Sequence, residues 1–145
     1  MIEYDAQDQR ILTTICTVFA AVNRHDAKAV RECYSDDAHA RDNALRTELT
    51  NPEIIESATK GWIAAVPDLH FEVIDIVHNR LKAAIECIFS GTLSSHIPGV
   101  TDEAALGSHF EIPYVSIMRF SQDGAIQQES YYWNLATLLD QIRIR

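Results

Sequence analysis

Asp42 is the residue of this sequence whose position best fits acid–base chemistry. It closes a short strand predicted over residues 38–42, and strand alternation places it on the same face as Ala38 and Ala40. Two small apolar neighbours fit a carboxylate that points into the protein, where burial would raise its pKa toward the range useful for proton abstraction. The alternative is that Asp42 and Asn43 only open a turn, since both residue types favour turns.

Two later strands could surround such a carboxylate with an apolar and aromatic lining. Residues 109–120 and 125–134 flank an Asp-Gly turn, which predicts a long hairpin. If both strands turn one face inward, they form a pocket with a few hydroxyl and amide groups. The alternative is that the aromatic side chains fill a core. The faces in question carry these residues: Tyr114, Ser116, Met118 and Phe120 on the first strand, and Ser130, Tyr132 and Asn134 on the second.

Other common catalytic or metal-binding patterns are not found in the sequence. The six histidines include no pair at HxH or HxxxH spacing, so we expect no metal site. The three cysteines, Cys16, Cys33 and Cys87, are odd in number and lie among apolar residues, which predicts buried free thiols in a reducing cytosol. No Gly-rich phosphate loop, GxSxG elbow or CxxC is present, which argues against nucleotide binding and serine hydrolase chemistry. We therefore expect no cofactor.

The composition is that of one globular domain, and we take residues 1–145 as a single domain. Hydrophobic residues make up 47% and charged residues 23%, which argues against a disordered chain. The formal net charge of −9 argues against binding to nucleic acid or to anionic membranes. Residues 1–10 are too acidic for a secretory signal, and the apolar stretch 11–22 is too short to span a membrane. These features predict a cytoplasmic protein.

The apolar periodicity predicts three helices, then a run of strands, then a last helix. Grouped helices followed by mostly antiparallel strands indicate an α+β fold. A curved sheet wrapped around the first helix would form a cone with one open mouth and a pocket inside. Residues 94–107 are expected to form a loop, and whether this loop acts as a lid stays open. The predicted helices are 6–24, 27–34, 52–66 and 135–142, and the strands before the hairpin are 38–42, 70–78 and 82–92.

Four short motifs together resemble a known superfamily. They are YSDDAHARDN (34–43), PDLHF (67–71), MRF followed by Asp-Gly, and YYWN before the terminal helix. In this order they resemble the SnoaL-like polyketide cyclases and the ketosteroid isomerases of the nuclear-transport-factor-2-like superfamily, over most of the chain. The resemblance implies the cone-shaped, cystatin-like α+β barrel. The superfamily includes enzymes, binding proteins and dimerisation modules, so the fold alone does not give the activity.

The resemblance supports Asp42 as a catalytic base, but it also shows that other functional residues of the relatives are replaced in this sequence. Asp42 falls at the place of the isomerases' catalytic base. Their two oxyanion donors, a helical tyrosine and a protonated aspartate, correspond to Val18 and Ser116 here. Because losing one such donor typically costs about 10²–10³ in rate, steroid isomerisation is not expected. The cyclases' acid/base aspartate corresponds to Asn134, which could donate a hydrogen bond to a substrate or simply cap the last helix.

These inferences predict proton transfer on a small, hydrophobic, carbonyl-rich compound, with Asp42 as the base and Ser116 and Asn134 as hydrogen-bond donors. The rival hypotheses are a noncatalytic protein that binds a hydrophobic ligand, and a dimerisation module with a filled core. The outer sheet face, with Val115 and Ile117, is a plausible homodimer surface, as the resemblance implies. The residues expected to contact the substrate are Trp62, Tyr114, Met118, Tyr132 and Val18.

Overall fold

The structure, a computed structural model, describes residues 6–98 and 100–142. The predicted order of helices and strands is confirmed, and the structure adds the short strand β2 and the 3₁₀ turn η1. The helices are α1 (Ala6–Asn23), α2 (Ala27–Arg31), α3 (Pro52–Ala65) and α4 (Leu135–Gln141), and η1 spans Glu103–Ala105. The strands are β1 (Tyr34–Asp42), β2 (Thr47–Leu49), β3 (His70–Asn79), β4 (Lys82–Thr92), β5 (His109–Phe120) and β6 (Ile126–Tyr132).

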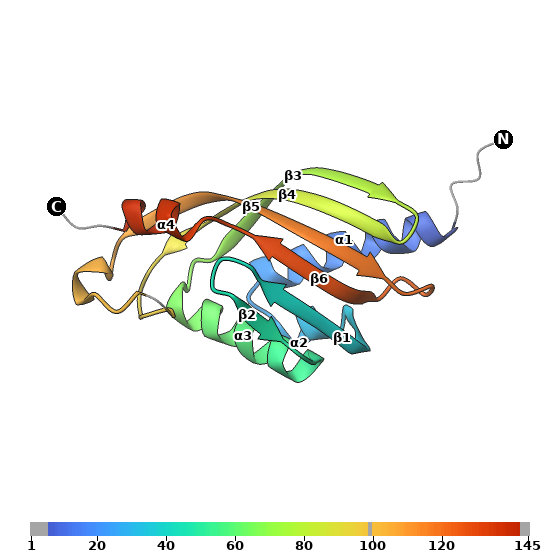
Figure 1. The fold of residues 1–145 in the computed structure, drawn as a ribbon, viewed down its shortest axis with the longest axis horizontal. Helices are drawn as coiled ribbons and strands as arrows, with labels where there is room; N and C mark the ends of the chain where they lie inside the picture. Colours follow the sequence, from blue (N-terminus) through green and yellow to red (C-terminus); the bar gives the residue numbers. More distant parts are fainter. Residues whose placement is uncertain (1–5, 99, 143–145) are drawn as a thin grey trace.

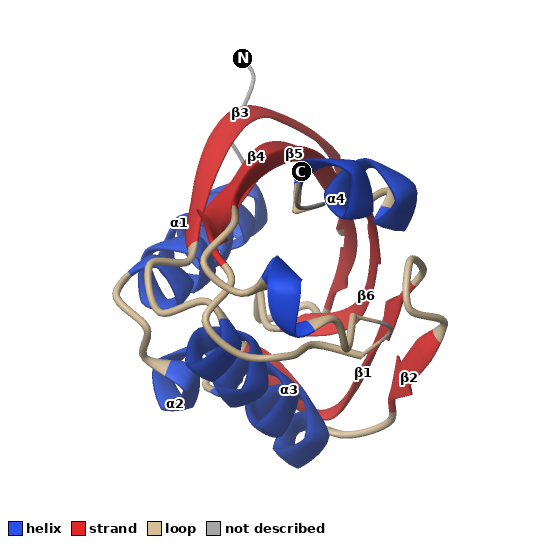
Figure 2. Ribbon diagram, turned by 90° about the vertical axis from the view of Figure 1, so that its left-hand side faces the viewer, coloured by secondary structure: helices blue, strands red, loops and turns tan. Residues whose placement is uncertain are grey.

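The described strands form one curved, open sheet in the order β2-β1-β6-β5-β4-β3. Neighbours pair antiparallel except β1 and β6, which pair parallel and make the sheet mixed. Figure 1 shows α1 running behind the strands, and Figure 2 shows the sheet curving around a space that α1, α2 and α3 cover on its concave side. The predicted α+β class and cone-like shape are confirmed.

Each helix that faces the sheet follows from its sequence. The stripe of Ile11, Ile15 and Phe19 on α1 is buried against the sheet, as the periodicity predicts. Asn51 caps α3 by accepting a hydrogen bond from the backbone N–H of Ile54, with Pro52 in the first turn. The start of α3 is therefore specified by residues next to it in the sequence.

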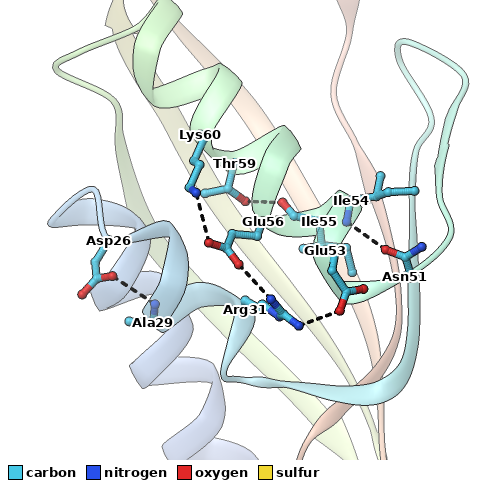
Figure 3. A network of polar contacts seen from close by, with 10 residues as sticks. All are labelled: Asp26, Ala29, Arg31, Asn51, Glu53, Ile54, Ile55, Glu56, Thr59 and Lys60. Atoms are coloured by element: carbon cyan, nitrogen blue, oxygen red, sulfur yellow. Dashed lines mark hydrogen bonds and ion pairs between the residues drawn. The ribbon is translucent and has the colours of Figure 1, made fainter.

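Ion pairs between α2 and α3 hold these two helices together (Figure 3). Arg31 of α2 contacts Glu53 Oε1 at 2.6 Å and Glu56 Oε1 at 3.3 Å. Lys60 adds a contact to Glu56 Oε2 at 3.2 Å, one helical turn further along α3. Arg31, Glu53 and Lys60 are partly exposed, and ion pairs at such positions typically contribute about 0–1 kcal/mol each.

A bulge interrupts the alternation of β6. Phe120 pairs with Ile126, whereas the preceding Arg119 pairs with Gln128, so Gln127 is an extra residue on β6. Ile126 points into the core, and simple alternation from it would send the other even-numbered side chains inward as well. The extra residue reverses the alternation beyond Gln127.

The predicted inward face of β6 is therefore wrong. Tyr132 is 49% exposed, and Ser130 and Asn134 also belong to the outward set. The side chains that point inward are their odd-numbered neighbours: Glu129, Tyr131 and Trp133. On β5, by contrast, the predicted inward set around Ser116 and Met118 is confirmed by burial.

The cysteines do not all lie where the sequence predicts. Cys33 and Cys87 are buried free thiols, but Cys16 lies on the exposed side of α1. Burial raises the pKa of the Cys87 thiol to about 12, so this group stays protonated and acts as an apolar core residue.

Candidate functional site

A cavity of about 100 Å³ lies between the helices and the concave face of the sheet. Its wall is mostly apolar and aromatic, with side chains from α1, α2, α3 and all six strands of the sheet. Four of the five residues predicted to contact a substrate line it, whereas Tyr132 is exposed on the opposite sheet face. The four lining residues are Val18, Trp62, Tyr114 and Met118.

One polar group of this inner cavity, Glu129, was missed by the sequence analysis. It is only 6% exposed, and each of its carboxyl oxygens is hydrogen-bonded to a hydroxyl group. Tyr34 Oη is hydrogen-bonded to Oε1 at 2.5 Å, and Ser116 Oγ is hydrogen-bonded to Oε2 at 2.5 Å. The signal that could have revealed Glu129 is its place opposite the inward-facing Met118, but the bulge in β6 hides this register in the sequence.

Burial dominates the electrostatics of Glu129. It raises the pKa of the Glu129 carboxyl, against the lowering effect of the two hydroxyl donors. Tyr34 also has a pKa well above its ordinary value, because of burial and the nearby Glu129. Within the described part of the chain, no lysine, arginine or histidine forms an ion pair with Glu129.

Asp42 is 2% exposed, so its predicted inward position is confirmed. Its Oδ1 also accepts hydrogen bonds from the backbone N–H groups of Ala44 and Leu45, both at 3.0 Å, so it shapes the following turn as well. Burial raises the pKa of the Asp42 carboxyl, while these amides and the side chain of Trp133 partly oppose the rise. Both interpretations of Asp42 thus describe the same buried carboxyl.

Asp42 borders a second space, a recess of about 240 Å³ next to the inner cavity. The turn between β1 and β2, the helix α3 and residues 96–98 form its walls. Four residues line both spaces and separate the recess from the inner cavity: Leu49, Ala58, Trp62 and Tyr131.

The two buried carboxyls lie on one face of neighbouring strands. In the parallel pairing of β1 and β6, Asp42 is opposite Tyr131 and Ala40 is opposite Glu129. The two acidic residues are therefore diagonal neighbours, roughly 7–8 Å apart at Cα. Tyr131 lies between them in this register. Burial, together with the charges of Asp42 and Glu129, raises the pKa of Tyr131.

The loop of residues 94–107 closes one side of the recess with His96, Ile97 and Pro98. The loop is packed rather than free: Ile97 and Val100 are buried, and the Ser94 N–H donates to the carbonyl of Ala65 at 2.7 Å. Position 99 lies outside the described residues.

The other two predicted catalytic residues do not meet Asp42. Asn134 is exposed, and its Oδ1 accepts a hydrogen bond from the Thr137 N–H at 3.0 Å, which is the helix-cap alternative. Ser116 is fully buried, and its hydroxyl bonds to Glu129. Neither residue is among those that line the cavity or the recess.

Among residues 6–98 and 100–142, no three histidine, cysteine or acidic side chains are grouped so that they could hold a metal ion. Over the same ranges, no helix has both the length and the apolar character needed to cross a membrane.

The fold is an open α+β cone with a buried carboxyl beside an apolar cavity. The sequence model of the SnoaL-like polyketide cyclases matches residues 13–142. This chain belongs to that family, as the four motifs predict. No curated protein matches the chain significantly.

Solved structures share the fold. A protein from Jannaschia sp. CCS1 described as a SnoaL-like polyketide cyclase has a TM-score of 0.84 at 13% identity, covering 98% of this chain and 97% of its own. IdmH from Streptomyces antibioticus, proposed to be a polyketide cyclase, has a TM-score of 0.77 at 25% identity, covering 92% and 98%. A protein of ketosteroid isomerase-like fold from Catenulispora acidiphila has a TM-score of 0.73 at 20% identity, covering 88% and 90%.

Proposed function

We propose that this protein catalyses proton transfer at an activated carbon atom of a small, hydrophobic carbonyl compound, with Asp42 as the base. The observation that carries the proposal is the buried Asp42 carboxyl at the edge of a recess that adjoins an apolar cavity. Burial makes this carboxylate a stronger base than an exposed one, because it disfavours the charged form. The turn amides that bind Oδ1 hold the carboxyl group in a fixed orientation.

The proposed step needs no redox partner. The Asp42 carboxylate takes a proton from a carbon between two carbonyl groups, the C–H electron pair becomes the enolate double bond, and the carbonyl π pair moves onto oxygen. Return of the proton to the same or another carbon completes the cycle. Such a carbon is already acidic, so the protein needs to stabilise the enolate only a little. This is consistent with Val18 at the position where the isomerases have an oxyanion donor.

The test is deuterium incorporation in heavy water, followed by NMR, into a panel of cyclic and acyclic 1,3-diketones. We expect wild-type exchange well above the buffer rate, and a loss of about 10²–10⁴-fold in Asp42→Asn. Asparagine keeps an oxygen for the Ala44 and Leu45 amides, so the turn should survive. Asp36→Asn, at an exposed position of the same strand, is the matched control and should leave the rate unchanged. Exchange at the buffer rate in the wild type, or undiminished exchange in Asp42→Asn, would refute the proposal.

A noncatalytic binding protein is the second candidate. The inner cavity favours it, since an apolar space of about 100 Å³ can hold a small ligand whether or not chemistry follows. This candidate predicts saturable binding of a diketone probe without deuterium exchange. A dimerisation module with a filled core is less compatible with the cavity.

We also propose a homodimer through the outer face of the sheet. Val77, 65% exposed on β3, lies in one row with Ile117 of β5 across the strand between them. Light scattering after size exclusion should give twice the mass of one chain. Ile117→Glu should halve that mass, because two-fold symmetry would bring like charges together, whereas Gln127→Glu at an exposed site should not. A wild-type mass equal to one chain would contradict the dimer.

A cytoplasmic location is proposed as well. The three cysteines are free thiols, and a reducing compartment preserves that state.

A further inference from the structure

Glu129 is a second buried carboxyl, and the proton transfer proposed for Asp42 does not use it. Tyr34 from β1 and Ser116 from β5 bind its two oxygens, each at 2.5 Å. Tyr34 and Glu129 are 95 residues apart in the chain and both line the inner cavity. Ser116 is fully buried and does not line it. The three side chains therefore form one hydrogen-bonded cluster, which Tyr34 and Glu129 extend to the mostly apolar wall of the cavity.

The surroundings of Glu129 favour its uncharged form. The titratable groups that face it are Tyr34 of β1, Cys87 of β4, Tyr114 of β5 and Tyr131 of β6. All four have raised pKa values and are neutral at pH 7, so none supplies a positive charge. A carboxylate buried without a cation loses its hydration, and two hydroxyl donors replace only part of it.

Counting hydrogens shows what the neutral group presents to the cavity. A protonated Glu129 and two hydroxyls carry three O–H hydrogens, but the two observed contacts use only two of them. One of the three O–H hydrogens is therefore left to donate elsewhere: that of the carboxyl if both hydroxyls donate to Glu129, or that of a hydroxyl if Glu129 donates to it. Ser116 has no cavity surface, whereas Tyr34 lines the cavity. Glu129 donating to Tyr34 Oη, with Ser116 donating to the other carboxyl oxygen, leaves the Tyr34 O–H free to point at a ligand.

We propose that the inner cavity binds the oxygen of a ketone or enol through the hydroxyl of Tyr34, which the protonated Glu129 frees for this donation. An ionised Glu129 would accept both hydroxyl hydrogens and leave no donor for a ligand. The proposal concerns ligand binding, and it holds whether or not Asp42 acts as a base. It makes Tyr34 the residue that selects for an acceptor oxygen, and Glu129 a positioning residue that acts through Tyr34.

The test compares two probes of equal shape, cyclopentanone and methylenecyclopentane, of which only the ketone has an acceptor oxygen. Five-membered rings suit a cavity of about 100 Å³. The protein's two tryptophans, Trp62 and Trp133, both line the cavity, so their indole N–H signals in ¹H–¹⁵N NMR spectra report occupancy. We expect the wild type to bind the ketone about tenfold more tightly than the alkene, the effect of one hydrogen bond.

Two variants separate the roles of Tyr34 and Glu129. Tyr34→Phe should remove the preference for the ketone and keep the affinity for methylenecyclopentane, which also verifies that the variant is folded. Glu129→Gln should keep the preference at pH 7, since the amide can donate to Tyr34 Oη and accept from Ser116 Oγ. A tenfold gain in ketone affinity in Glu129→Gln would show that Glu129 is ionised and would overturn the proposal.

The pH dependence of the wild type gives a test without any mutation. Burial raises the pKa of Glu129, and the neutral form binds the ketone, so affinity should fall as pH rises through that raised value. Glu129→Gln should show no such fall. Equal affinity for the two probes in the wild type, or no binding of either, would refute the assignment. Neither outcome would bear on deuterium exchange by Asp42, so the two proposals can fail separately.

Discussion

Phe89→Ala is expected to lower the free energy of unfolding by about 3–5 kcal/mol. Phe89 is 3% exposed and lies at the centre of an aromatic cluster. Its ring stacks on Phe71 at 4.8 Å and meets Trp62 and Phe110 edge-on at 5.5 and 5.1 Å. Truncation removes these contacts and leaves a hole that three rings from different elements cannot fill together.

The same substitution should change ligand size selection, because Phe89 lines the inner cavity. We expect urea unfolding to show the stability loss, and NMR titration to show that the variant accepts cyclohexanone more readily than the wild type does. Phe89→Leu should lose less than Phe89→Ala, and Lys28→Ala at an exposed site of α2 should stay within about 0.5 kcal/mol. A loss below about 1 kcal/mol in Phe89→Ala would show that the cluster repacks.

Gly91→Ala is expected to destabilise the protein by about 1–3 kcal/mol. A Cβ atom at position 91 would lie 2.1 Å from Val66 Cγ1 and 3.2 Å from Asp68 Oδ1. Val66 is fully buried, and Asp68 is held by hydrogen bonds from Thr92, so neither side chain can move aside cheaply. The strand β4 must therefore separate from the end of α3 to admit the methyl group.

Combining Gly91→Ala with Val66→Ala tests this explanation. Removing Cγ1 should relieve the clash, so Val66→Ala should cost less in the Gly91→Ala background than alone, with a coupling of about 0.5–3 kcal/mol. Thermal or urea unfolding of the four proteins of the cycle measures the coupling. Strictly additive losses would show that Gly91 is needed for another reason.

Local patterns predicted the helices and most of the strands well. The stripe on α1 and the cap at Asn51 depend on residues within a turn or two, so they are visible without the fold. The inward face of β5 around Ser116 follows from a regular alternation through that part of the strand. On β6, one extra residue at Gln127 reverses the alternation, and nothing local marks it.

The candidate site divides in the same way. Asp42 could be found from the sequence, because its neighbours Ala38 and Ala40 and the following turn decide that it lies inward. The contact of Tyr34 with Glu129 could not be found from the sequence. It depends on the parallel pairing of β1 with β6, two strands that are far apart in the chain. The sequence by itself therefore determined the fold class and one buried carboxyl. Tertiary structure alone decided the second carboxyl and the cavity beside it, since strand register and burial result from contacts between distant segments.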